Sequence, residues 1–189
     1  VLMVAANNED YLTTLLAVLL LGAVPCAVAP PPTPSREDSA GVAHLRAAMR
    51  VVNPKLVLAD RRSAVAAPHP GLIDYADIVP VQPDSRLDRI PPLPTDLHHI
   101  QLTSGSTSAP KAVQLTHGNV TDNIASIGHA IGSRRGRDRV FSWLPMYHDM
   151  GFIQVLGALL YGAPVALMTP LGFLRDPLSW PRHMTHHGS

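Results

Sequence analysis

Apolar runs of two lengths alternate along this 189-residue chain, and this alternation most limits the folds open to it. Residues 11–21 and 39–52 have the length and periodicity of helices, whereas residues 24–29 and 55–59 are short apolar runs next to prolines, as in buried strands. Helices that alternate with short strands favour a parallel sheet wound on both faces. We therefore expect an α/β fold with a mostly parallel sheet flanked by helices.

The rest of the chain continues this pattern after an interruption. Residues 68–96 hold many of the 19 prolines, so we expect an irregular connector there, with one short strand near residues 78–81. Beyond the connector the pattern predicts helices at 117–131, 150–161 and 177–187 and strands at 140–143 and 165–168. Thr116 is expected to cap the first of these helices.

A segment rich in hydroxyl groups separates two alternating apolar runs, 100–102 and 112–115. Both runs resemble half-buried strands, so we expect an exposed loop between two antiparallel strands. The loop consists of Thr103, Ser104, Gly105, Ser106, Thr107, Ser108, Ala109, Pro110 and Lys111. Hydroxyls and backbone N–H groups bind phosphate oxygens, glycine lets the backbone approach closely, and lysine adds positive charge. The segment therefore predicts a polyphosphate site.

Two better-known motifs do not fit this loop. Lys111 lies six residues after Gly105, as a Walker loop requires, but Pro110 replaces the second glycine and Ala112 the Mg²⁺-binding hydroxyl. A nucleophile elbow fails because no glycine stands two places after either candidate serine, 106 or 108. For the loop taken alone, a plain surface turn rich in serine and threonine stays open as the alternative.

A second motif, Ser142-Trp-Leu-Pro-Met-Tyr-His-Asp-Met-Gly151, follows some thirty residues later. With the first it resembles the adenylate-forming superfamily, which includes acyl-CoA synthetases, fatty acyl-AMP ligases and peptide-synthetase adenylation domains. Residues 103–107, Pro110 and Lys111 match the family's phosphate loop, whereas Ser108 and Ala112 stand where the family usually has glycine. Residues 144–151 are most similar to the fatty acyl-AMP ligase branch, and residues 1–32 to the family's early N-terminal segment.

This resemblance implies that the chain is part of a large N-terminal domain that joins a fatty acid to ATP, giving acyl-AMP. It places Thr103 to Ser108 and Lys111 at ATP, with Lys111 on the β- and γ-phosphates. It places His148 beside the carboxylate and the α-phosphate, so Lys111 and His148 are the expected catalytic residues. Mg²⁺ is expected to have its ligand outside this chain, which we expect to be a fragment that is inactive alone. The first hypothesis for the acceptor is a carrier-protein thiol, and the second is coenzyme A. The third hypothesis is that the chain is a non-catalytic remnant that binds a nucleotide or a partner domain.

The residues of the second motif also have simpler explanations. His148 could cap the helix that starts near Asp149, and an apolar trio that would line an acyl or adenine pocket could be plain core: Trp143, Met146 and Met150. A hydrolase triad of Ser106, His148 and Asp149 is formally possible. We expect it to fail, because adjacent His and Asp side chains do not readily form the ordered pair that a triad needs.

Composition excludes several classes of protein. The formal net charge of +1 argues against a nucleic-acid binder, and Cys26, the only cysteine, allows no intrachain disulfide and suits a reducing cytoplasm. The apolar residues 15–24 are too few to span a bilayer. Three histidines have the helical spacing of metal ligands but lack supporting cysteines or carboxylates, so we expect a solvated helix end and no metal site: His183, His186 and His187.

Overall fold

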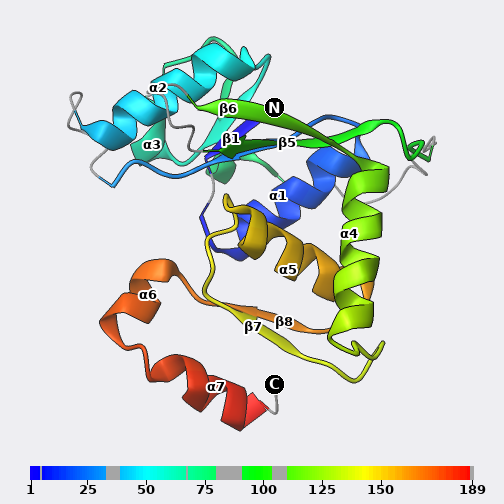
Figure 1. Ribbon diagram of the computed structural model, residues 1–189. Helices are drawn as coiled ribbons and strands as arrows, with labels where there is room; N and C mark the ends of the chain where they lie inside the picture. The colour runs from blue at the N-terminus through cyan, green and yellow to red at the C-terminus, as the bar shows by residue number, and fades with distance from the viewer. Residues whose placement is uncertain (5, 33–38, 67, 80–90, 104–109, 188–189) are drawn as a thin grey trace. The chain divides into compact units, whose positions relative to one another are not determined.

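A computed structural model describes the chain except residues 5, 33–38, 67, 80–90, 104–109 and 188–189 (Figure 1). The chain divides into two compact units. Unit 1 comprises residues 1–5 and 10–117, and unit 2 comprises residues 6–9 and 118–189. The short segment 6–9 therefore makes its contacts with a part of the chain more than a hundred residues away.

Unit 1 is built on a six-stranded sheet with the strand order β4-β3-β1-β2-β5-β6. The strands are β1 (Leu2–Val4), β2 (Cys26–Val28), β3 (Val57–Ala59), β4 (Leu72–Asp74), β5 (Leu97–Thr103) and β6 (Lys111–Thr116). Every neighbouring pair is parallel except β5 and β6, which are antiparallel. The mostly parallel α/β fold expected from the sequence is thus confirmed.

Helix α2 (Ala40–Val52) has both end signals in its sequence. The Ser39 hydroxyl accepts a hydrogen bond from the Val42 N–H at 3.3 Å, and Asn53 ends the helix in the left-handed conformation, φ 46°. Its buried face packs in the core of unit 1 with strands β1, β2 and β3. Helix α1 (Glu9–Leu20) lies in unit 1 apart from its first residue. In the described part of the chain, no helix is long and apolar enough to cross a membrane.

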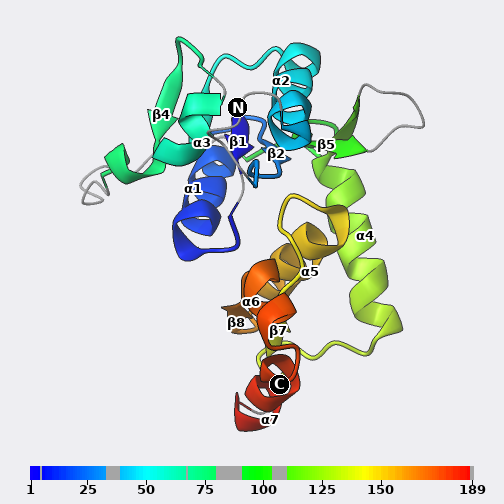
Figure 2. The same cartoon turned by 90° about the vertical axis from the view of Figure 1, so that its left-hand side faces the viewer.

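The connector differs from its prediction in where it forms a strand. The strand is β4, at Leu72–Asp74, rather than near residue 78; residues 78 and 79 are irregular, and residues 80 and 81 lie outside the described part. The Asp74 carboxylate accepts a hydrogen bond from the Ala76 N–H at 3.0 Å, which turns the chain into a 3-10 helix and ends the strand. Helix α3 (Arg61–Ala66), which we did not expect, lies beside β4 (Figure 2).

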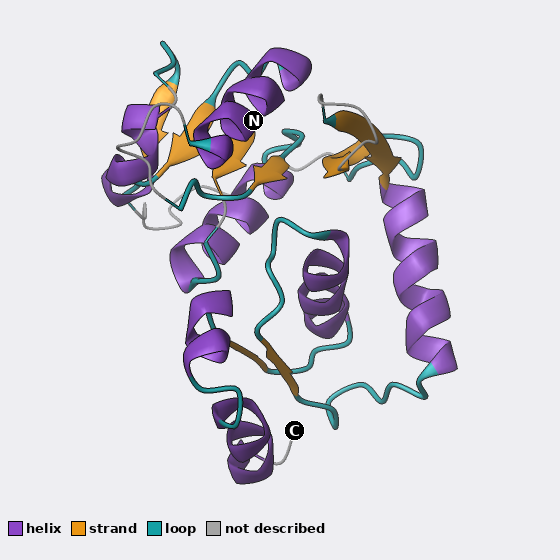
Figure 3. Ribbon diagram, turned by 60° about the vertical axis from the view of Figure 1, so that its left-hand side comes forward, coloured by secondary structure: helices purple, strands orange, loops and turns teal. Residues whose placement is uncertain are grey.

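Unit 2 contains a second, two-stranded parallel sheet (Figure 3). Its elements are α4 (His117–Ala130, of which His117 belongs to unit 1), β7 (Val140–Ser142), α5 (Asp149–Leu160), β8 (Val165–Leu167), α6 (Pro170–Arg175) and α7 (Ser179–His187). Helix α5 is the crossover between the parallel strands and packs on both. Helix α6 was not expected, although Thr169 caps it, with its hydroxyl 3.0 Å from the Gly172 N–H.

Aromatic contacts hold the C-terminal helices of unit 2 to the rest of that unit. The Trp180 indole N–H donates to the Phe141 carbonyl at 3.2 Å, and Phe173 stacks on Trp143 with ring centroids 3.9 Å apart. His183 stacks on Phe141 at 5.2 Å. His183 therefore packs against a ring, and within the described ranges no three His, Cys, Asp or Glu side chains are grouped as metal ligands.

Candidate functional site

The hydroxyl-rich loop is carried by the β5–β6 hairpin of unit 1. Thr103, the last residue of β5, is the Cα partner of Lys111, the first residue of β6. A strand rather than a helix begins at Lys111, which excludes the Walker loop and confirms the antiparallel flanks. Lys111 is exposed. The predicted phosphate-binding residues between these ends lie outside the described residues: Ser104, Gly105, Ser106, Thr107 and Ser108.

Two buried histidines lie near the other end of this hairpin, and sequence reasoning missed them. His98 and His99 are only 6% and 5% exposed, and their Nδ1 atoms are 3.0 Å apart. The β5–β6 register shifts between Leu97 and His99, and such a bulge lets consecutive side chains of a strand both be buried. Burial lowers the pKa of each histidine to about 4, so both rings are neutral near pH 7.

His148 lies in unit 2, where the β7–α5 turn meets the helix. Its backbone is in the N-cap conformation of α5, and its carbonyl accepts from the Phe152 N–H at 2.9 Å, but its side chain caps no N–H group. The imidazole is 69% exposed, and its Nδ1 lies 2.6 Å from Asp149 Oδ1. His148 is thus the N-cap residue of α5, as the simpler explanation expected, although its side chain makes no capping hydrogen bond.

The contact between His148 and Asp149 corrects an expectation. We expected that adjacent His and Asp side chains would not readily form the ordered pair of a triad, but at this N-cap the two side chains are in contact. The same Asp149 oxygen accepts from the Met150 N–H at 2.7 Å. The Met150 N–H first, and His148 second, lower the pKa of the Asp149 carboxyl below its usual value. Ser106 lies outside the described residues, so no triad is seen.

A close approach of backbone to backbone fixes the turn before His148. A Cβ atom added to Gly151 would lie 2.3 Å from the Pro145 carbonyl oxygen, so only glycine fits in this first turn of α5. The His148 N–H donates to the same carbonyl at 3.0 Å. Met146, only 1% exposed, anchors the turn in the apolar core. The position of His148 is thus set by local packing.

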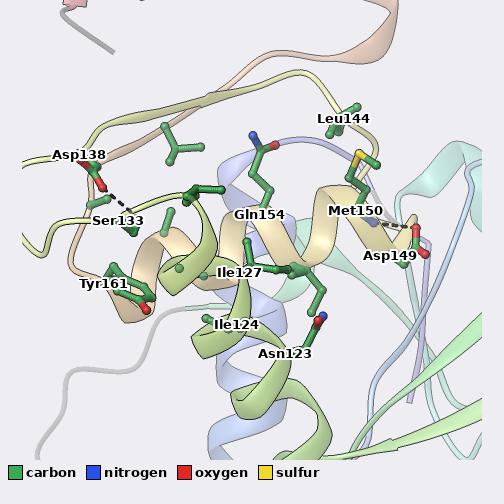
Figure 4. A pocket seen from close by; sticks show the side chains of 17 residues that line it. Asn123, Ile124, Ile127, Ser133, Asp138, Leu144, Asp149, Met150, Gln154 and Tyr161 are labelled. Atoms are coloured by element: carbon green, nitrogen blue, oxygen red, sulfur yellow. Dashed lines mark hydrogen bonds between the residues drawn. The ribbon is translucent and has the colours of Figure 1, made fainter.

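Between α4 and α5 lies a cavity of about 520 Å³ that extends to the N-terminus of α5 (Figure 4). Its walls are mainly apolar and include Ile124, Ile127, Ile131, Leu144, Met150 and Ile153. Asp149 and Asn123 add polar groups to the lining. Met150 lines the cavity. Trp143 and Met146 do not line it, because the first stacks on Phe173 and the second is buried in the core.

The chain is similar in sequence to proteins named as fatty-acid ligases. The chain is 32% identical over 188 residues to the long-chain-fatty-acid–AMP ligase FadD32 of Mycobacterium marinum, covering 94% of this chain and 29% of that protein. It is 40% identical over 89 residues to the medium-chain-fatty-acid–[acyl-carrier-protein] ligase TtuA of Teredinibacter turnerae, covering 46% of this chain and 14% of that protein.

The fold likewise matches a solved structure, a fatty acyl-adenylate ligase from L. pneumophila in complex with acyl adenylate and pyrophosphate. The TM-score is 0.81 at 26% identity, covering 100% of this chain and 33% of that one. The chain thus spans about a third or less of the length of these proteins. The sequence model of the AMP-binding enzyme family matches residues 1–188. This chain therefore belongs to the AMP-binding enzyme family.

Proposed function

We propose that this chain supplies the acid- and phosphate-binding elements of a ligase that converts a fatty acid and ATP to acyl-AMP and pyrophosphate. The observation that carries this proposal is the apolar cavity between α4 and α5, which extends to the helix end where His148 lies. A fatty acid has the same two parts, an apolar tail and an anionic head.

The cavity suits the tail of such an acid. Its volume of about 520 Å³ falls in the range typical of small-molecule sites, and isoleucine side chains from both helices form much of its wall. At the α5 end, the helix N-terminus carries partial positive charge, and His148 has an exposed ring that can donate a hydrogen bond to a carboxylate. The Asp149 carboxylate accepts from His148 Nδ1 and fixes the ring, so Nε2 would donate to a carboxylate when the ring carries a proton on both nitrogens.

Lys111 is the residue proposed to act on the phosphates. It stands exposed at the start of β6, next to the hydroxyl-rich segment that carries the family's phosphate-loop pattern. ATP, when bound, supplies the α-phosphorus that the carboxylate attacks, with pyrophosphate as leaving group. Lys111 would neutralise charge on that leaving group. The Mg²⁺ ligand is proposed to lie elsewhere in the whole protein, as the resemblance of the two motifs to the family implies.

The proposed acceptor of the acyl group is a thiol of an acyl carrier protein in the cytoplasm. The name of TtuA, a carrier-protein ligase that shares 40% identity over 89 residues, supports this choice. Coenzyme A is the alternative acceptor. Supplying preformed acyl-AMP with each acceptor to the whole protein distinguishes the two, because only the true acceptor should give thioester.

The experiment that tests acid activation is ATP–pyrophosphate exchange by the whole protein with acids of increasing length. Lys111→Ala should weaken ATP use by about 10- to 150-fold whichever acid is supplied, as expected for loss of about 1.5–3 kcal/mol from one charge-assisted contact. His148→Ala should instead impair use of the acid and spare the KM for ATP. Lys55→Ala and His129→Ala change exposed residues of the same types and are the controls.

Three results would contradict the proposal. Exchange that does not depend on any carboxylic acid would exclude acid activation. Equal loss in Lys111→Ala and His148→Ala for every acid, with ATP affinity falling alike, would refute the division of roles. Full activity in both variants would show that the adenylation site is not built on these two motifs.

A further inference from the structure

A buried asparagine ties the His148 turn to the start of the chain, within unit 2. Asn7 is 7% exposed, although Asn8 and Glu9 beside it are exposed. Its side chain contacts the loop after β7, some 140 positions later in the sequence, and the end of β8. Buried polar side chains normally have partners for their hydrogen-bonding groups.

The hydrogen bonds of Asn7 use both ends of its amide. Its Oδ1 accepts from the Met146 N–H at 2.9 Å, and its Nδ2 donates to the carbonyls of Leu144 at 2.7 Å and Met168 at 3.3 Å. The Trp143 carbonyl lies at 3.5 Å from the same nitrogen. Only a carboxamide both donates and accepts in this way. Aspartate would keep the shape of the side chain but would turn two donors into a charge that faces carbonyl oxygens.

These bonds reach the residues that set the position of His148. Met146 is two residues before His148, and its side chain is buried in the core. The Pro145 carbonyl lies so close to Gly151 that the turn has little room to move. Met168 directly follows β8, and its N–H donates to the Ser142 carbonyl at the end of β7. Asn7 thus joins the carboxyl ends of both parallel strands, which is where α/β folds place their ligands.

We propose that Asn7 is a positioning residue that holds the β7–α5 turn so that His148 faces the acid carboxylate. The proposal rests on the proposed function, because it gives Asn7 its role through His148. Asn7 itself does not line the cavity. Its loss should therefore act on the acid and not on ATP, and only while His148 is present.

The first test measures the turn itself. Hydrogen exchange is followed in the whole protein for the peptide that spans residues 144–148, which includes the Met146 amide. Asn7→Leu and the similarly shaped Asn7→Asp should each raise exchange there at least about tenfold, because local opening becomes easier. Asn8→Asp, the same change at the exposed neighbour, should not. Unchanged exchange in both Asn7 variants would overturn the proposal.

The second test is a double-mutant cycle with His148→Ala, read as acyl-AMP formation. Alone, each Asn7 variant should lower kcat/KM for the acid by about 10- to 100-fold, as expected for a displaced reacting group, with the KM for ATP within about twofold. In the His148→Ala background the same change should cost less than about threefold. A purely structural role predicts equal losses in both backgrounds, and that result would overturn the proposal.

Failure of the proposed function has a different signature. If the wild-type protein forms no acyl-AMP, or if His148→Ala is fully active, acid activation at His148 is wrong and the reaction role of Asn7 falls with it. The exchange measurement would still show whether Asn7 holds the turn. Another outcome is that His148→Ala is impaired as expected while Asn7→Leu lowers kcat/KM for the acid as much in the His148→Ala background as in the wild-type background. In that case only the positioning role of Asn7 is wrong.

Discussion

Filling the cavity between α4 and α5 from Gly157 should shorten the acids that the whole protein accepts. Gly157 lines the cavity on α5, and a Cβ atom added there would meet Ile124 at 3.5 Å, an ordinary contact distance. A side chain can therefore start from this position without a backbone shift. Gly157→Leu should also strengthen the helix, because glycine is about 1 kcal/mol worse than leucine inside one.

The magnitude follows from the methylene groups that the new side chain displaces. Leucine adds four carbons, so it should exclude about three methylenes of a long acid, each contributing about 0.8 kcal/mol of burial. The loss of roughly 2.4 kcal/mol corresponds to about a 60-fold lower kcat/KM for long acids. Acids too short to reach Gly157 should react as before.

Acyl-AMP formation across a series of straight-chain acids is the assay. Ala125→Leu enlarges an exposed position of α4 that does not line the cavity, and it should leave the length profile unchanged. A uniform loss for all lengths in Gly157→Leu, or an unchanged preference for long acids, would refute the assignment of this cavity to the acyl chain.

The remaining predictions concern stability, measured as the free energy of unfolding in urea. Gly151→Ala should destabilise the protein by about 1–3 kcal/mol, because its Cβ would meet the Pro145 carbonyl, whereas Gly157→Ala should stabilise it by up to about 1 kcal/mol; the same sign for both would contradict the packing described. Stability should also fall as the pH drops from 6.5 towards 4, by at most roughly 3 kcal/mol for each of His98 and His99. The unfolded chain binds protons in this pH range that the folded chain excludes, so this contribution to stability is fully present above pH 6.5. A free energy of unfolding that does not change between pH 6.5 and 4 would show that these rings are not buried as neutral groups.

The sequence by itself determined those features that depend on neighbouring residues. The two flanks of the hydroxyl-rich loop alternate, and they form the strands β5 and β6. Ser39 and Asn53 mark the ends of α2 through contacts within four residues. The paired motifs also determined the family, which the match over residues 1–188 confirms. Such signals are readable because their energy comes from the local backbone.

Some errors arose where local signals compete. The strand predicted near residue 78 lies instead at Leu72–Asp74, because pairing with β3 and an aspartate turn decide where extended structure ends. Adjacency argued against an ordered pair of His148 and Asp149 of the kind that a triad needs, yet the two side chains are in contact at the N-cap of α5. In each place, the outcome depended on a backbone conformation that residue type alone does not specify.

Only the tertiary structure revealed Asn7, the buried histidine pair and the cavity. In the sequence, Asn7 is an ordinary polar residue before a helix. Nothing near it indicates that its amide forms hydrogen bonds with the backbone of Leu144 and Met146. The cavity likewise exists only because α4 and α5 pack side by side within unit 2. Contacts between residues more than a hundred positions apart are formed by the packing of whole elements, and a linear pattern records which residues can be buried but not what they will meet.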